Sequence, residues 1–133
     1  AQGDRGARAV TGSFTVDAAG FLYLMPNAVL EFLAHDLTAT EAAVLAAAQK
    51  PIRASALLDR VTDAAWYTRP CWYGVADEDR LFAPALQRKT AQRINASVVS
   101  LRAGHLPFLS KPNETAAVIL AAVESVRGRQ PRR

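Results

Sequence analysis

The sequence has 133 residues, of which 50% are hydrophobic and 21% are charged, so it fits one small globular domain and excludes a disordered chain. The net charge of +4 comes from arginines in segments 1–8 and 127–133, because ten basic and eleven acidic side chains lie between them. With no basic stripe we expect no nucleic-acid partner, and with no apolar run of roughly 20 residues we expect no membrane partner.

The first element expected in chain order is a β-hairpin. Residues 1–12 are polar and contain glycine, and we expect them to form a flexible lead-in. Residues 13–16 and 21–24 are short apolar runs on either side of Asp17 and Gly20. A glycine between two such runs can take the positive φ of a tight turn, so the spacing predicts two antiparallel strands.

Helical segments are expected next. Pro26 can open one at its first turn. Thr38 and Glu41 have the spacing of a capping box at the start of an alanine-rich helix. Residues 52–58 predict one or two further helical turns. Because residues 13–65 lack a strong amphipathic repeat, they are expected to form a cap or lid region on a larger core.

Residues 66–127 predict a different organisation, in which strands and helices alternate. Residues 71–76 are continuously apolar, which indicates a strand buried on both faces. Residues 96–101 predict the next strand. Helices are expected over residues 84–94, with Leu86 and Ile94 facing inward, and from Asn113 onward, with Leu120 and Val123 facing the sheet. Residues 128–133 would be a basic tail.

This order places an acid and a histidine at one edge of the sheet. Right-handed crossovers make the two strands parallel, with Asp79 after the carboxyl end of one and His105 after that of the other. A hydrolytic triad needs an acid that orients an imidazole and an imidazole that accepts a proton. Taken singly, Asp79 also suits a turn or a helix cap, and His105 an exposed loop residue. Their joint placement favours the triad roles.

Other chemistry is weakly supported by the sequence. His35 and His105 are 70 positions apart and the acids at 77–79 form one loop cluster, so no metal site is expected. His35, beside Asp36 at a predicted helix end, is expected to be a surface residue. Without a glycine-rich phosphate loop we expect no cofactor. The single cysteine, Cys71, excludes an intrachain disulfide and fits a cytoplasmic location.

Several motifs resemble one known family. Residues 70–80 (PCWYGVADEDR) have a Pro-x-Trp-Tyr strand and an acid loop ending in Asp-Arg. Residues 81–87 have a hydrophobic-Pro-x-x-Gln helix start, and residues 104–112 contain Gly-His and a Ser-x-Pro turn. Together with residues 17–24 and 50–56, they resemble bacterial α/β-hydrolases related to the small-ester hydrolases of the salicylate-esterase and hydroxynitrile-lyase type. The resemblance covers about residues 14–126.

The resemblance implies an α/β fold class, namely a partial α/β-hydrolase fold. It would consist of a helical cap with a hairpin, plus the last parallel strands of the core and their flanking helices. Asp79 is implied as the triad acid and His105 as the general base, acting on a small ester or a related carbonyl compound. The apolar substrate pocket is expected to be shaped by residues of the cap and its junction: Phe21, Leu22, Leu24, Phe32 and Trp66.

The family's nucleophile is missing from this sequence. It sits in Gly-x-Ser-x-Gly on a strand-to-helix turn, and none of the six serines here has glycines at that spacing. Cys71 begins a predicted strand and is interpreted as structural. We therefore expect half of an assembly, paired with an N-terminal hydrolase half or with further copies of itself, and active only if a partner chain supplies the serine. The alternative is an inactive, truncated paralogue acting as an oligomerising or binding module.

Overall fold

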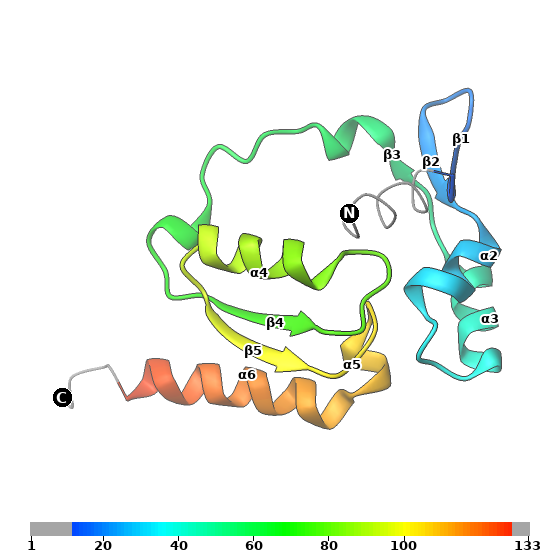
Figure 1. Ribbon diagram of the computed structural model, residues 1–133. Helices are drawn as coiled ribbons and strands as arrows, with labels where there is room; N and C mark the ends of the chain where they lie inside the picture. Colours follow the sequence, from blue (N-terminus) through cyan, green and yellow to red (C-terminus); the bar gives the residue numbers. More distant parts are fainter. Residues whose placement is uncertain (1–11, 129–133) are drawn as a thin grey trace.

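The computed structural model describes residues 12–128, which form two sheets with their associated helices (Figure 1). A three-stranded antiparallel sheet has the order β1-β2-β3, and a two-stranded parallel sheet contains β4 and β5. The predicted lead-in and basic tail, apart from Gly12 and Gly128, lie outside the described residues.

The predicted hairpin is confirmed. Strand β1 (Phe14–Val16) pairs antiparallel with β2 (Phe21–Leu24). One carboxylate oxygen of Asp17 accepts the amide protons of Ala19 and Phe21, each at 2.9 Å. Gly20 has a φ of 81°, which a residue with a side chain adopts only under strain. The turn is therefore fixed by one acid and one glycine.

The prediction of helical turns over residues 52–58 is wrong at its start. Ile52–Arg53 form a third strand, β3, which pairs with the free edge of β2, and a short 3₁₀ helix follows over Ala54–Leu57. Backbone partners on β2 are available to this segment, and the Arg53 guanidinium lies 4.7 Å from the centre of the Phe21 ring. Tertiary pairing therefore overrides the local helical tendency.

Between β2 and β3 the chain is helical. Helix α2 (Pro26–Ala28) continues directly into a π-helical turn, η1 (Val29–Leu33), and α3 (Ala39–Ala48) follows. The predicted capping box at the start of α3 is present, with Thr38 and Glu41 each binding the other's backbone amide.

These helices enclose the core of the cap region. Buried Val29, Leu33, Ala34 and Ala42 form its centre. Two side chains from distant loops also pack against it: Leu81, which follows Asp79, and Leu106, which follows His105. The cap region is therefore in contact with both loops that carry the predicted site.

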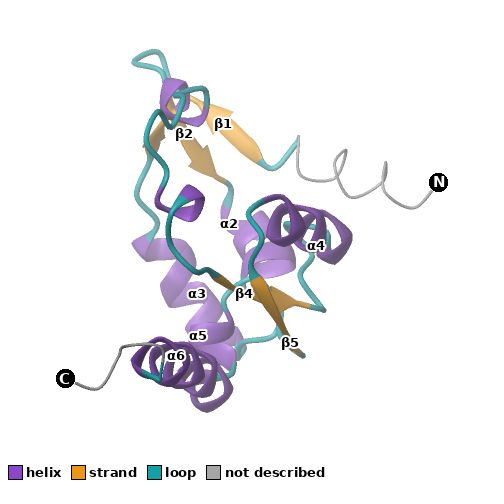
Figure 2. Ribbon diagram, turned by 90° about the vertical axis from the view of Figure 1, so that its left-hand side faces the viewer, coloured by secondary structure: helices purple, strands orange, loops and turns teal. Residues whose placement is uncertain are grey.

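The predicted parallel strands are confirmed. Strand β4 (Trp72–Ala76) pairs with β5 (Ser97–Leu101) over its whole length. Helix α4 (Pro84–Arg93) lies on one side of the pair, and α6 (Pro112–Arg127) lies on the other, preceded by the short α5 (Pro107–Ser110) (Figures 1 and 2). This arrangement is consistent with the expected partial α/β fold.

The burial of this second unit differs from the predictions. Leu86 is 53% exposed and Leu120 is 61% exposed, whereas Gln87 and Ala91 occupy the buried face of α4. Two strands about 4.8 Å apart are narrower than a helix of about 10 Å diameter, so each apolar helix stripe extends beyond the sheet. For the same reason β4 is fully buried only at its carboxyl end, at Val75 and Ala76. No helix within residues 12–128 has the length and apolar character needed to cross a membrane.

The capping box gives a direct test of the cap region. Replacing Thr38 with alanine removes the oxygen that accepts the Glu41 amide proton and should lower the free energy of unfolding by about 1 kcal/mol. Thr40→Ala is the matched control, since Thr40 is exposed within α3 and does not cap it. Urea denaturation measures both variants. An equal loss in the two would show that the capping contact contributes nothing.

Candidate active site

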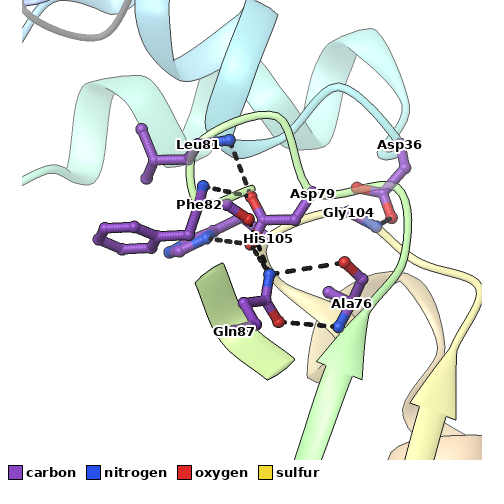
Figure 3. Close-up of polar contacts among 8 residues, drawn as sticks. All are labelled: Asp36, Ala76, Asp79, Leu81, Phe82, Gln87, Gly104 and His105. Carbon is purple, nitrogen blue, oxygen red and sulfur yellow. Dashed lines mark hydrogen bonds and ion pairs between the residues drawn. The ribbon is translucent and has the colours of Figure 1, made fainter. Parts of the chain in front are cut away.

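Asp79 occupies the turn between β4 and α4, and only 9% of the residue is exposed. One of its carboxylate oxygens, Oδ1, accepts the amide protons of Leu81 at 2.8 Å and Phe82 at 2.9 Å. The other, Oδ2, accepts from the side-chain amide of Gln87 at 2.8 Å. The acid is thus fixed by its own turn and by the following helix (Figure 3).

Gln87 is a residue of this site that the helical pattern did not indicate. Its Oε1 accepts the Ala76 amide proton at 3.0 Å, while its Nε2 donates to Asp79 and, at 2.8 Å, to the Phe82 carbonyl. One buried amide therefore connects the end of β4 to both sides of the acid turn. The only signal in the sequence was its place in the family-like Pro-x-x-Gln pattern.

His105 reaches the same site from the end of β5. The two loops are held side by side because the Asp77 amide donates to the Leu101 carbonyl, and the Glu78 amide donates to the Ala103 carbonyl. The His105 Nδ1 lies 2.9 Å from Asp79 Oδ2, and 23% of the side chain is exposed. Two residues 26 positions apart are therefore brought into direct contact, as the parallel topology predicted.

The electrostatics of this contact assign a role to each nitrogen of the ring. Burial opposes ionisation of Asp79, but the hydrogen bond from His105 and the amides of Phe82 and Leu81 outweigh it and lower the pKa of the carboxyl. An ionised carboxylate only accepts hydrogen bonds, so His105 Nδ1 must carry the proton. In the neutral form of the imidazole, Nε2 therefore holds a lone pair and can act as a base.

A pocket of about 340 Å³ opens beside this pair. Its wall is about equally polar and apolar, and it contains both the Asp79 carboxylate and the His105 imidazole. The residues that line it are Trp72, Tyr73, Gly74, Ala76, Asp79, Phe82, Gln87, His105 and Pro107. The Phe82 ring lies 5.3 Å from the His105 ring, centre to centre, and limits how the imidazole can turn.

The five residues predicted to shape the pocket lie elsewhere. None of Phe21, Leu22, Leu24, Phe32 and Trp66 lines the pocket at His105. The hairpin stands away from the β4–β5 edge in both views, with Phe21 under Arg53 and Leu24 at a separate pocket beside Met25 and Lys50 (Figures 1 and 2). Trp72 and Tyr73 line this pocket instead, because strand β4 forms part of its wall.

His35 corrects another expectation, since it and its neighbour Asp36 are only partly exposed. Asp36 accepts the Gly104 amide proton at 2.6 Å, beside the catalytic-site candidate His105 (Figure 3). The His35 Nδ1 and Asp36 Oδ1 atoms are buried. The segment of His35 and Asp36 therefore packs against the loop that carries His105. This contact joins residues 68 positions apart, so no local sequence pattern reveals it.

No serine or cysteine lines the pocket among residues 12–128. Cys71 precedes β4, so it lies at the opposite end of that strand from Asp79, and its thiol donates to the Arg69 carbonyl at 3.4 Å. In the same part of the chain, no three His, Cys, Asp or Glu side chains are grouped closely enough to hold a metal ion.

The fold and the site together define an α/β unit with a hydrogen-bonded acid and histidine at the carboxyl ends of adjacent parallel strands. Comparison with known families agrees: the model described as the alpha/beta hydrolase family matches residues 2–118. The search of curated proteins finds no match. The chain belongs to the alpha/beta hydrolase family, and its resemblance to the small-ester subgroup stays a prediction.

The Gln87 contacts predict that removing this side chain strongly destabilises the fold. Gln87→Ala leaves the buried Ala76 amide without its acceptor and should lower the unfolding free energy by about 2 kcal/mol. Hydrogen exchange at the Ala76 amide should also accelerate. Gln92→Ala, at an exposed position of the same helix, is the control and should be nearly neutral. Equal stability of the two variants in urea would contradict this account of the acid turn.

The lowered pKa of Asp79 predicts a specific acid sensitivity. Because the folded pKa lies below the ordinary value of 3.8, ionised Asp79 stabilises the fold above that value, and this contribution is lost as pH falls from there through the folded pKa. Asp79→Asn should therefore show a shallower decline of unfolding free energy over this window than the wild type. Denaturation at a series of pH values measures the slopes. Asp63→Asn, at an exposed position, should keep the wild-type slope.

Proposed function

We propose that this chain supplies the acid and the base of a serine-type hydrolase acting on small carboxylic esters or related carbonyl compounds. Asp79 would be the acid and His105 the base, and the serine would come from polypeptide outside these 133 residues. The 2.9 Å hydrogen bond between the two side chains, at the open mouth of a pocket, is the observation that carries the proposal.

The proposed chemistry follows from the ring nitrogens. His105 Nε2 takes the proton of the serine hydroxyl as the serine oxygen attacks the ester carbonyl. Asp79 stabilises the imidazolium through Nδ1–H. The imidazolium then gives the proton to the leaving alcohol, and an acyl-serine remains. In the second half, His105 takes a proton from water, the hydroxide attacks the acyl group, and the proton returns to the serine.

The pocket wall supports an uncharged substrate. Trp72, Phe82 and Pro107 supply apolar surface, and no lysine or arginine lines the pocket within residues 12–128. An anionic group such as a phosphate would have no cationic partner there. A volume of about 340 Å³ suits a small molecule. A short-chain ester fits these features better than a phosphorylated compound does.

The unpaired edge of β4 offers a place where a serine-bearing strand can pair. Among the strands of residues 12–128, β4 pairs with β5 alone, which leaves its other edge for a further strand. The pocket runs along that strand, past Trp72, Tyr73 and Gly74. A parallel strand added there would end at the same rim as β4, so the loop after it would face His105.

Complementation tests the proposal. The 133-residue chain is combined with a polypeptide carrying an α/β-hydrolase nucleophile elbow, and a short-chain p-nitrophenyl ester is added. We expect a burst of nitrophenol only from the combination. His105→Ala should abolish the burst, and Asp79→Asn should slow it by about 10³–10⁴-fold, because the imidazole loses its orienting acid. Asp77→Asn, whose side chain pairs with Arg88 at the surface, is the matched control.

Gel filtration distinguishes the outcomes of this experiment. If the two polypeptides co-elute and release no nitrophenol, the hydrolase proposal fails. A stable homo-oligomer without activity in any combination would instead support an oligomerising module. The exposed apolar residues on β5 and α6 are where such an association would form: Val98, Val99, Ile119, Leu120 and Val123.

A further inference from the structure

A second carboxylate holds the histidine loop from its other side. Asp36 lies in the cap region between η1 and α3, and its Oδ2 accepts the amide proton of Gly104 at 2.6 Å. Gly104 is the residue directly before His105. A hydrogen bond to an ionised acceptor is shorter and stronger than a neutral one, so this contact can fix the peptide that precedes the imidazole.

The fit around Gly104 leaves no room for movement toward the cap region. A Cβ atom at this position would lie 2.5 Å from Asp36 Oδ1 and 2.8 Å from His35 Cε1. Gly104 is buried, so the close approach is a packed contact and not a surface encounter. The glycine is therefore required by the proximity of residues 35 and 36.

Asp36 is held ionised in this setting, which strengthens the hydrogen bond that it accepts from Gly104. Burial opposes its ionisation, but the nearby Ser110 hydroxyl and the Gly104 amide outweigh that effect and lower the pKa of the carboxyl. Ser110 ends α5, which follows His105, and Leu106 packs against the core of the cap region. The cap region thus contacts the histidine loop before and after the imidazole.

We propose that Asp36 is a positioning residue for His105: by holding the Gly104 peptide, it keeps the imidazole at hydrogen-bonding distance from Asp79. Asp79 then sets the direction of the ring, and Asp36 sets the place of the main chain that carries it. The importance of this for catalysis rests on the proposed function, but the positioning itself is measurable in the chain alone.

The experiment follows the His105 Nδ1–H proton by NMR in the full chain. In Asp36→Ala the exchange of this proton with water should accelerate by about tenfold, and so should the exchange of the Gly104 amide proton. About tenfold is the effect expected from the loss of one hydrogen bond. Asp36→Asn keeps an oxygen that can accept from Gly104 and should restore slow exchange. Gly104→Ala adds a Cβ atom that pushes Asp36 away from the main chain at position 104. It should therefore accelerate the exchange of the His105 Nδ1–H proton as Asp36→Ala does.

Two controls separate positioning from general stability. Asp17→Ala removes another carboxylate that binds backbone amides, within the hairpin turn, and should leave the His105 signal unchanged. The Ala76 amide, which Gln87 holds in the sheet, reports opening of the site as a whole. In Asp36→Ala the acceleration at His105 should exceed any at Ala76.

Two results would overturn the inference. One is a His105 Nδ1–H exchange rate that is unchanged, or that rises only in step with Ala76. Another is failure of Asp36→Asn to restore slow exchange. If Asp36→Ala does not fold, Gly104→Ala with the carboxylate intact decides the matter. Co-elution of the wild-type chain with the elbow-bearing polypeptide, without nitrophenol release, would reject the hydrolase proposal, yet leave a positive exchange result standing.

Discussion

The buried carboxylate of Asp79 is the constraint on which the second half of the structure depends. Placing an ionised carboxylate in the interior costs several kcal/mol unless its oxygens are hydrogen-bonded. Here donors come from the acid turn, from Gln87 on α4 and from His105 on the next loop. The turn after β4, the start of α4 and the loop after β5 must therefore meet at one point. The geometry that satisfies this charge is also the geometry of an acid–base pair.

The sequence predicted those parts of the site that follow from local pattern and chain order. Two apolar runs separated by a helix imply parallel neighbours, and residues after their carboxyl ends must then share an edge, which brings Asp79 to His105. Gln87 and Asp36 could not be found in this way. A glutamine beside Leu86 on a helix looks solvent-facing by hydrophobic pattern alone. It turns inward because the Ala76 amide and Asp79 need partners that no apolar side chain provides.

The role of the cap region also differs from the sequence-based expectation. Five apolar residues of the cap region and its junction were predicted to line the substrate pocket, yet Phe21 lies beneath Arg53 and none of the five lines the pocket at His105. What the cap region contributes instead is support. Its core receives Leu81 and Leu106 from the two site loops, and Asp36 binds the Gly104 amide. Such contacts join residues far apart in the chain, so neither periodicity nor motif spacing could reveal them.

Asp79 and His105, the proposed acid and base, are already hydrogen-bonded to each other within residues 12–128. Both partners are also held by contacts within residues 12–128, because Gln87 binds Asp79 and Asp36 binds the Gly104 amide next to His105. A serine-bearing strand that adds to the edge of β4 would therefore have to place only its own hydroxyl near His105 Nε2. Preorganised partners cost less entropy to assemble than partners that must order each other on contact. This division of the proposed triad suits a site completed by association, because the more demanding charge arrangement is set before the serine arrives.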